Sequence, residues 1–356
     1  MLFPLIPILS IASIIVTTAT GAPSQIRSTD ALGGTLIHQF PYPTWVENLV
    51  VRHDNTILCS IATAPEIYLI DPSNPNSPTT ATLLHSFPAP YVGLTGITET
   101  TSDQFYAVVG NISLLEGNFG FGGYTIHSLK LGDYGSGDGA GTVLVEEVVA
   151  MPQAGLLNGL ITLSVEQELL LAADSRNGCI WLISVLTGTY SIFLQEPEMM
   201  PQFPDLSTGL GINGIRFLTK EVEGQRIADL YFTNQFFASV FHLAFDLETY
   251  ERIGPVTVVE QGMVVDDFCL DAELGVAYTA NGPGNALVRL GLQDGVEETV
   301  YGGKSETVLL GPTSAEFGRG EVGTGMVYVT TSGSMENTGP EGLLQGGRVL
   351  GVNVGF

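Results

Sequence analysis

Positively charged residues are scarce in this chain. Lys and Arg together number 12 against 37 Asp and Glu, which gives a formal net charge of −25 at pH 7. A surface of that sign repels phosphate groups, so nucleic acid is excluded as a partner and an anionic membrane surface is disfavoured.

Cysteine is also scarce, with three residues in the whole chain. Cys59, Cys179 and Cys269 each lie in an apolar segment with strand character, far apart in the sequence. An odd number of widely separated, apolar-flanked cysteines favours buried free thiols over a disulfide framework.

Several signatures of catalysis are missing as well. The sequence contains no HExxH, P-loop, EF-hand or GxSxG motif, and none of its five histidines lies beside a nucleophile in the repeated segments described below. The chain is therefore not expected to carry a serine or cysteine triad.

Glycine and proline, by contrast, are abundant. The chain has 44 Gly and 19 Pro, and only 14% of its residues are charged. This composition is typical of many short strands joined by tight turns, and it predicts an all-β protein.

A short segment recurs six times, each copy with a small polar residue between apolar ones and a β-rich strand after it. The copies are VENL, LTGI, LNGL, INGI, VDDF and PTSA, with polar positions at Glu47, Thr95, Asn158, Asn213, Asp266 and Thr313. A repeat of roughly 50 residues is one propeller blade long. We predict a six-bladed β-propeller that forms one domain, residues 22–356.

The strand pattern also predicts how the ring closes. Five blades have a candidate outer strand, whereas the chain ends on the third strand of the last blade. A strand over 35–40, ahead of the first repeat, would supply the missing edge and bring the termini together.

The N-terminus indicates the compartment. Residues 1–16 are largely apolar and are followed by small residues such as Ala19 and Gly21. We predict a signal peptide over 1–21 and a secreted protein or one of the secretory pathway, with no membrane contact after cleavage; an uncleaved anchor is the alternative. Asn111-Ile112-Ser113 is a candidate glycosylation site.

Equivalent positions on the innermost strands of a propeller converge on its central channel. Glu47, Asn158, Asn213 and Asp266 are therefore candidate catalytic residues, and Thr95 and Thr313 are candidate substrate contacts. Carboxylate and amide oxygens suit Ca²⁺ or Mg²⁺, so Glu47, Asn213 and Asp266 would be the ligands if an ion is bound. The alternative is that these groups bond only backbone or channel water.

Aromatic residues near the predicted channel mouth are candidates for binding an apolar or aromatic small molecule. They are Trp45, Tyr91, Phe119, Phe121, Phe236, Phe237 and Phe268. Ordinary packing between blades is the alternative for each of them.

The segments around Glu47, Asn158, Asn213-Gly214-Ile215 and 266–273 resemble the gluconolactonase and senescence-marker-protein propellers. That resemblance implies a divalent ion held by Glu, Asn and Asp at such positions. Asp267 departs from the pattern, because the family usually has Gly there, and it could crowd or re-tune the ion site.

TWVENL, LGINGI, the DDF segment, residues 281–285 and GPTSAEFGR at 311–319 resemble a secreted fungal branch of that superfamily. Its characterised members include hetero-Diels-Alderases of tropolonic sesquiterpene pathways, which join a quinone methide to a humulene-type terpene. The resemblance implies a pericyclase of meroterpenoid biosynthesis, a reaction that requires no cofactor. We expect the protein to be a monomer. A lactonase dependent on Ca²⁺ or Mg²⁺ and a non-catalytic binding propeller are the alternatives.

Overall fold

The computed structural model describes residues 33–75, 81–113, 118, 120–132, 141–202, 210–336 and 342–355. Residues 32–356 form one compact unit. The predicted signal peptide lies outside the described residues, and so does Phe119. Within the described ranges, no helix has the length and apolar character that a membrane crossing requires.

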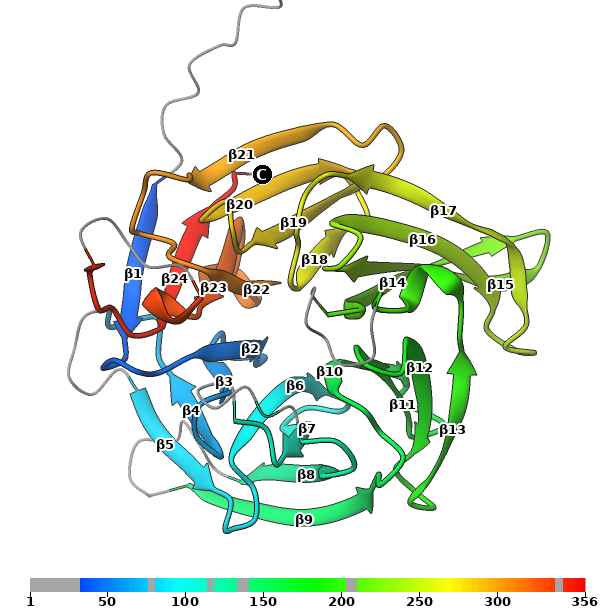
Figure 1. Cartoon of the computed structure of the whole chain (residues 1–356), viewed down its shortest axis with the longest axis horizontal. Helices are drawn as coiled ribbons and strands as arrows, with labels where there is room; N and C mark the ends of the chain where they lie inside the picture. Colours follow the sequence, from blue (N-terminus) through cyan, green and yellow to red (C-terminus); the bar gives the residue numbers. More distant parts are fainter. Residues whose placement is uncertain are drawn as a thin grey trace, which may run out of the picture. The chain divides into compact units, whose positions relative to one another are not determined.

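Six four-stranded antiparallel sheets are arranged around one axis, which confirms the predicted propeller (Figure 1). Blade 1 contains β2 (Val46–Val51), β3 (Ile57–Ile61), β4 (Glu66–Ile70) and β5 (Ala81–Ser86). Blade 2 contains β6 (Gly93–Glu99), β7 (Gln104–Gly110), β8 (Tyr124–Gly132) and β9 (Thr142–Ala150). Blade 3 contains β10 (Leu157–Ser164), β11 (Leu169–Asp174), β12 (Cys179–Ser184) and β13 (Thr189–Leu194).

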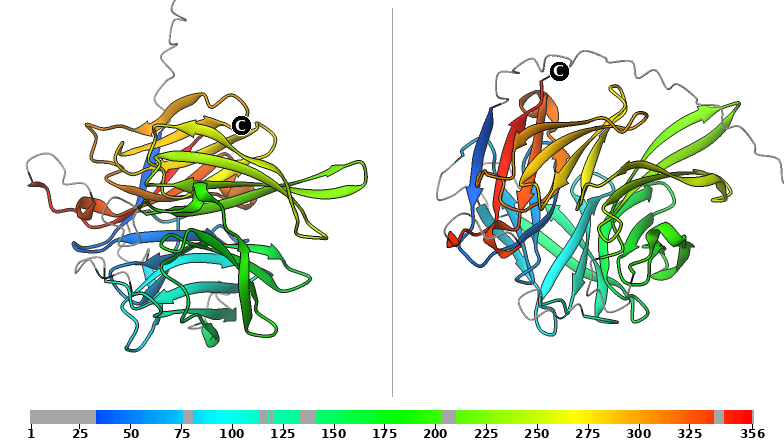
Figure 2. Two further views of the ribbon diagram at one scale, coloured as in Figure 1. Left: turned by 45° about the vertical axis from the view of Figure 1, so that its right-hand side comes forward. Right: turned by 45° about the horizontal axis from the view of Figure 1, so that its top comes forward.

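Blade 4 contains β14 (Ile212–Val222), β15 (Gln225–Asn234), β16 (Ser239–Asp246) and β17 (Arg252–Gln261). Blade 5 contains β18 (Phe268–Asp271), β19 (Val276–Asn281), β20 (Ala286–Gly291) and β21 (Glu297–Gly302). Blade 6 contains β22 (Pro312–Phe317), β23 (Met326–Thr331), β24 (Arg348–Asn353) and β1 (Gly34–Gln39). The short helices are η2 (Pro197–Met199), α1 (Gly320–Gly323) and η3 (Gly333–Met335). The long β14–β15 hairpin extends outward from the ring (Figure 2).

The ring is closed as the sequence predicts. β1, at the N-terminal end of the described chain, pairs antiparallel with β24 and is the outermost strand of blade 6. The last blade is thus assembled from both ends of the chain, so β24 is paired on both sides and strand pairing closes the ring.

The hydrophobic core lies between neighbouring blades. One cluster, for example, joins Leu171 and Ile180 of blade 3 to Phe232 and Phe245 of blade 4. Cys59, Cys179 and Cys269 are buried and free, as predicted. Burying apolar faces between sheets explains why the apolar pattern recurs once per blade.

Hydrogen bonds also join each blade to the next beside the axis. The Ser60, Thr95 and Ser175 hydroxyls donate to Thr95 O, Leu157 O and Ile212 O at 2.6, 2.9 and 2.6 Å. The Thr233 hydroxyl, the Asp267 N–H and the Thr313 hydroxyl donate to Asp266 O, Thr313 O and Val46 O at 2.8, 3.0 and 2.7 Å. Together these bonds link all six blades in a closed circuit.

A buried carboxyl group on the outer strand of blade 4, Glu260, lies near the exposed Glu297 on the outer strand of blade 5. Glu260 Oε1 accepts the Met263 N–H at 3.1 Å, and Oε2 has no partner of good geometry among the described residues. Burial, and then a hydrogen bond and repulsion from Glu297, raise the pKa of Glu260 to about 7. Both effects favour the protonated form of Glu260.

The raised pKa of Glu260 predicts that its contribution to stability decreases as the pH rises. The folded pKa of Glu260 lies above the ordinary 4.5, so its contribution is complete below pH 4.5 and is lost as the pH rises through about 7. Because Glu260→Gln imitates the protonated carboxyl, we expect its Tm to fall less than that of the wild type between pH 5 and 8. Thermal unfolding monitored by circular dichroism measures this, with the exposed Glu248→Gln as the matched control. Parallel Tm curves for all three proteins would refute it.

Candidate functional site

The chain direction places the six repeated polar residues at one end of the propeller. Each lies at the start of an inner strand or just before it, and the inner strands all run the same way along the axis. Tyr42, Phe121, Met200, Phe237, Leu343 and Leu344 lie on connections at this same end and are exposed by 40 to 66%. We call these six residues the apolar rim.

The pairing of five inner strands is irregular at the polar position. The register shifts at Val46/Asn48, Leu94/Ile97, Leu157/Leu160, Ile212/Ile215 and Pro312/Ser314, each time at the polar position. A β-bulge breaks the alternation of side chains, so consecutive residues can both approach the axis. The sequence repeat located these positions but did not predict the bulges.

Close approach of the inner strands explains the glycines that follow three of the polar residues. A Cβ on Gly96 would lie 2.3 Å from Asn158 O, and one on Gly159 would lie 2.7 Å from Asn213 O. Both contacts involve the backbone of the next blade, which cannot move aside cheaply. The glycines are therefore required by the spacing of the blades.

We expect Gly96→Ala to destabilise the protein by about 1–3 kcal/mol, because the added methyl group overpacks the contact between blades 2 and 3. Gly33→Ala is the control, since a Cβ there meets nothing within 4 Å. Guanidinium chloride unfolding of both variants measures the difference. Equal midpoints would show that the inner strands can separate without cost.

Three of the four predicted catalytic residues come together. Glu47 and Asp266 lie near enough to repel one another, and the Asn213 amide approaches the Asp266 carboxyl. All three are buried, with 8, 7 and 1% of their surfaces exposed. The Asn158 amide, also buried, points to the Ser175 hydroxyl at a marginal 3.5 Å.

The two carboxyl groups are held in an unfavourable environment. Burial, followed by repulsion from Glu336 and Asp267, raises the pKa of Glu47 to about 7, against the hydrogen bond from the Trp45 indole N–H. Burial and then repulsion from Glu47 raise the pKa of Asp266 well above its ordinary value, although Asn213 opposes the shift. Both carboxyl groups therefore resist ionisation in the absence of a cation.

Glu336 is a member of the site that sequence reasoning missed. It follows η3 in the connection from β23 to β24, and it is exposed to solvent. Nearby protein atoms reduce the hydration of its carboxyl group and so raise its pKa. It belongs to no repeat, so no periodic signal could identify it.

Asn213 Nδ2 is the other unusual group. It is buried, and no acceptor among the described residues meets it with good hydrogen-bond geometry. The amide lies near the Asp266 carboxyl and opposes part of the rise in its pKa, but the alignment of the two groups is poor. A buried N–H of this kind gains most from an acceptor that a ligand supplies.

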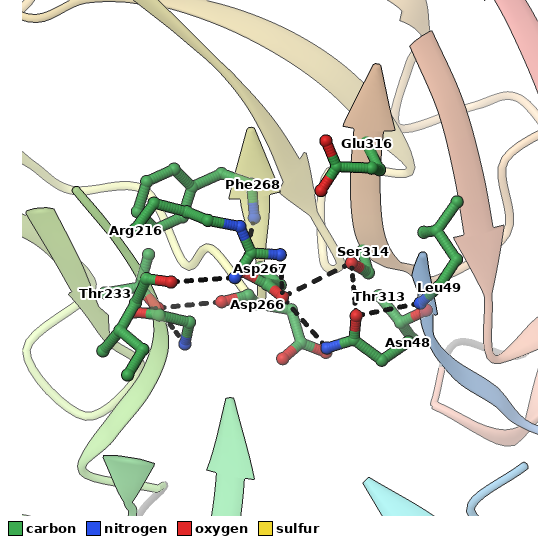
Figure 3. Close-up of polar contacts among 12 residues, drawn as sticks. Asn48, Leu49, Arg216, Thr233, Asp266, Asp267, Phe268, Thr313, Ser314 and Glu316 are labelled. Atoms are coloured by element: carbon green, nitrogen blue, oxygen red, sulfur yellow. Dashed lines mark hydrogen bonds and ion pairs between the residues drawn. The ribbon is translucent and has the colours of Figure 1, made fainter. Parts of the chain in front are cut away.

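Below these residues lies a second group, which we call the lower tier: Asn48, Arg216, Asp267 and Ser314. Asp267 Oδ2 accepts hydrogen bonds from Asn48 Nδ2 at 2.9 Å, Arg216 Nη2 at 2.8 Å and Ser314 Oγ at 3.4 Å (Figure 3). Asp267 thus does more than crowd a possible ion site: its carboxylate is engaged by Arg216 while its charge raises the pKa of both Glu47 and Asp266.

The remaining predicted contacts are dispersed. The Thr95 and Thr313 hydroxyls donate to the backbone of the next blade, and Phe268 is fully buried in the core between blades 4 and 5 rather than at the axis. Phe121 packs against the Arg176 guanidinium, and Phe236 lies beside Phe237.

Tyr91 donates to the Thr125 hydroxyl and packs against Phe87 and His127, which is a packing role. Asn111 is exposed. A surface cleft of about 440 Å³ lies on blade 5, lined by Gly275, Arg289 and Asp294 among others, and includes none of the axial residues.

The donor chemistry at the axis fits a hard divalent cation. Glu47, Asp266, Asn158 and Asn213 offer oxygen atoms of the kind that Ca²⁺ and Mg²⁺ prefer, and a cation would relieve the repulsion between the carboxyl groups. Among the described residues, no group of three or more His, Cys, Asp and Glu side chains is arranged to hold a metal ion. The amide oxygens would therefore be needed to complete such a site.

No protein-family model matches the sequence. A protein of Phoma sp. provisionally named a hetero-Diels-Alderase is 25% identical over 328 residues, which cover 87% of this chain and 89% of that protein. One from Sarocladium schorii with the same provisional activity is 25% identical over 358 residues, which cover 90% of this chain and 82% of that protein.

Solved structures share the fold. Luciferin-regenerating enzyme has a TM-score of 0.62 at 14% identity, covering 90% of this chain and 95% of its own. The calcium-binding protein regucalcin from Agrobacterium tumefaciens has a TM-score of 0.55 at 14% identity, covering 90% and 94%. The resemblance noted in the sequence is confirmed at the level of the fold: this chain shares the propeller fold of luciferin-regenerating enzyme and regucalcin, and its sequence relatives carry the names of enzymes.

Proposed function

We propose that this protein is a pericyclase that catalyses a hetero-Diels–Alder reaction between a quinone methide and a terpene in meroterpenoid biosynthesis. Relatives with that provisional name match most of the chain. The observation that carries the proposal is the buried Asn213 amide, an N–H donor without a well-aligned acceptor, at the same end of the propeller as the apolar rim.

The rim and the axial groups suit two different parts of the substrates. The exposed Phe121, Phe237 and Leu344 side chains offer apolar surface to a hydrocarbon. The Asn213 N–H groups would donate to the quinone methide oxygen, where negative charge develops as the new bonds form. A donor fixed in a buried site stabilises such charge more strongly than water does.

The proposed step needs no acid, base or redox partner. The C=C–C=O unit of the quinone methide contributes four π electrons and an alkene of the terpene contributes two. One C–C and one C–O σ bond form, and the remaining π bond completes an aromatic ring, so no proton, hydride or leaving group is transferred. Holding the two reactants in one pose can lower the barrier by about 7–11 kcal/mol.

We expect the full chain to accelerate cycloadduct formation from an ortho-quinone methide generated in solution and a humulene-type alkene. Asn213→Leu removes the N–H donor at similar volume and should reduce kcat on the order of 10²-fold. Chiral chromatography of the adduct measures rate and stereochemistry, with Glu248→Gln as the control. Unchanged turnover in Asn213→Leu would remove this amide from the mechanism, and a racemic product at the background rate would reject the activity.

A metal-dependent lactonase is the second candidate, favoured by the repulsion between the Glu47 and Asp266 carboxyl groups. In that case Glu47, Asn158, Asn213 and Asp266 would hold a divalent cation, which would polarise a lactone carbonyl when bound. The exposed Glu336 carboxyl group would then accept a proton from the attacking water.

Chelation separates the two candidates. We expect adduct formation to persist after EDTA treatment, and Asp266→Ala to retain part of it, because shape and orientation supply most of the acceleration. Turnover of lactone probes that is abolished by EDTA, restored by Ca²⁺ or Mg²⁺ and absent in Asp266→Ala would establish the hydrolase instead.

We further propose a secreted monomer with a cleaved signal peptide and a glycan on Asn111. The exposure of Asn111, beyond the end of β7, is compatible with modification. Peptide mass mapping of secreted protein, with and without glycosidase, tests both the cleavage point and the glycan.

A further inference from the structure

We propose that the lower tier of Asn48, Arg216, Asp267 and Ser314 is a positioning device that fixes the separations of Glu47, Asn213, Asp266 and Thr313 above it. The proposal rests on the proposed function where it concerns catalysis, but its structural part can be tested without turnover. None of the four side chains is required to touch substrate.

The sequence spacing couples the two levels. Asn48, Asp267 and Ser314 each follow directly after Glu47, Asp266 and Thr313, and Arg216 comes three residues after Asn213. Bulges at Val46/Asn48, Ile212/Ile215 and Pro312/Ser314 bring successive residues of these strands to the axis. A bond between two lower-tier side chains therefore constrains the backbone that carries the residues above them.

The lower tier joins the blades that carry the site. Asp267 of blade 5 accepts from Arg216 of blade 4, Asn48 of blade 1 and Ser314 of blade 6, and Ser314 also donates to Asn48 Oδ1 at 3.2 Å. In blades 2 and 3 the corresponding positions are Gly96 and Gly159, which have no side chain to contribute. The cross-links thus connect the strands of Glu47, Asn213 and Asp266.

The bonding is strong because it is buried and charge-assisted. The exposed fractions are 2% for Asp267, 4% for Asn48 and 0% for Ser314, and the Arg216 side chain is 15% exposed. Asp267 Oδ1 also accepts the Phe268 N–H at 2.8 Å, and Arg216 Nη1 donates to Ile215 O at 2.8 Å. Removal of one partner leaves a buried charge, whereas removal of both charges leaves a neutral network.

The lower tier links inner strands that are not neighbours in the ring. Blade 6 lies between blades 1 and 5, and Asp267 of blade 5 reaches both Asn48 of blade 1 and Ser314 of blade 6 through hydrogen bonds. Without the lower tier, blades 1 and 5 can relax apart at their inner strands, and the substrate groups are then held less closely. We expect kcat to fall more than KM rises, because the relaxed site still binds the substrates but orients them less well for reaction.

Arg216→Met, Asp267→Asn and the double variant form the test. We expect Arg216→Met to lower kcat by at least about tenfold, and the double variant to regain a large part of the lost kcat. The effects of substitutions at two interacting residues depart from simple additivity by up to about a hundredfold. The matched control is Arg52→Met, which breaks another buried ion pair, with Asp103 at 2.8 Å, near the opposite end of the inner strands. It should lower Tm without changing kcat.

A second readout needs no substrate. The chain has two tryptophans, so its amide spectrum contains two indole signals. The Trp45 N–H donates to Glu47, whereas the Trp181 N–H donates to Asp174 at 3.0 Å in blade 3, outside the lower tier. We expect Arg216→Met to shift or broaden the Trp45 signal and leave the Trp181 signal in place, and Arg52→Met to move neither.

The outcomes are distinct. A wild-type protein without cycloadduct formation rejects the proposed function, while a selective change of the Trp45 signal still supports the lower tier as a positioning device. Unmoved Trp45 signals in folded Arg216→Met overturn the positioning proposal whatever the activity. Equal losses of kcat in Arg216→Met and Arg52→Met, or no recovery in the double variant, overturn its catalytic part.

Discussion

The fold depends on how six separate sheets are held together where they meet beside the axis. Neighbouring blades share no strand ladder, so apolar packing and a few hydrogen bonds must fix their spacing. Hydroxyl groups such as those of Thr95 and Thr313 donate to the backbone of the next blade, and Asp267 N–H completes the circuit. The polar side chains that remain for the site are those not engaged in these hydrogen bonds, which are the carboxyl groups and amides.

Much of the architecture can be predicted from the sequence, because each blade repeats one pattern of burial. The period predicts the number of blades, and the missing outer strand of the last blade predicts the closing strand over 35–40, which the structure contains as β1. Phe268 was misplaced for a physical reason: a strand that starts directly after Asp266 and Asp267 resumes alternation, so the next side chain turns into the core. The position of Glu336 could not be predicted, because it lies in a long connection between β23 and β24 that is not part of the repeat.

The chemistry of the site follows from an imbalance between its polar groups. Glu47 and Asp266 are buried close together, and none of the described groups that shift their pKa values is a cationic side chain. Asn213 Nδ2, meanwhile, has no well-aligned acceptor among the described residues. A carbonyl oxygen satisfies the amide, and a cation satisfies the carboxyl groups. Cycloaddition thus uses the N–H group of Asn213, whereas metal-assisted hydrolysis uses the oxygen atoms of the carboxyl groups and amides. The fold shared with structures at 14% identity is compatible with both reactions.

The lower tier shows why Asp267 and Arg216 have to be considered as a pair. A glycine at position 267, as in the family pattern, would leave the Arg216 guanidinium buried beside Glu316 and the Ile215 carbonyl, without its ion-pair partner. An apolar residue at 216 would leave the Asp267 carboxylate buried below two other carboxyl groups that it already repels. Each change alone is costly, so the two residues constitute one structural choice. The Arg216–Asp267 ion pair is a permanent link between blades 4 and 5 beside the axis. A bound cation would link the blades only while it occupied its site.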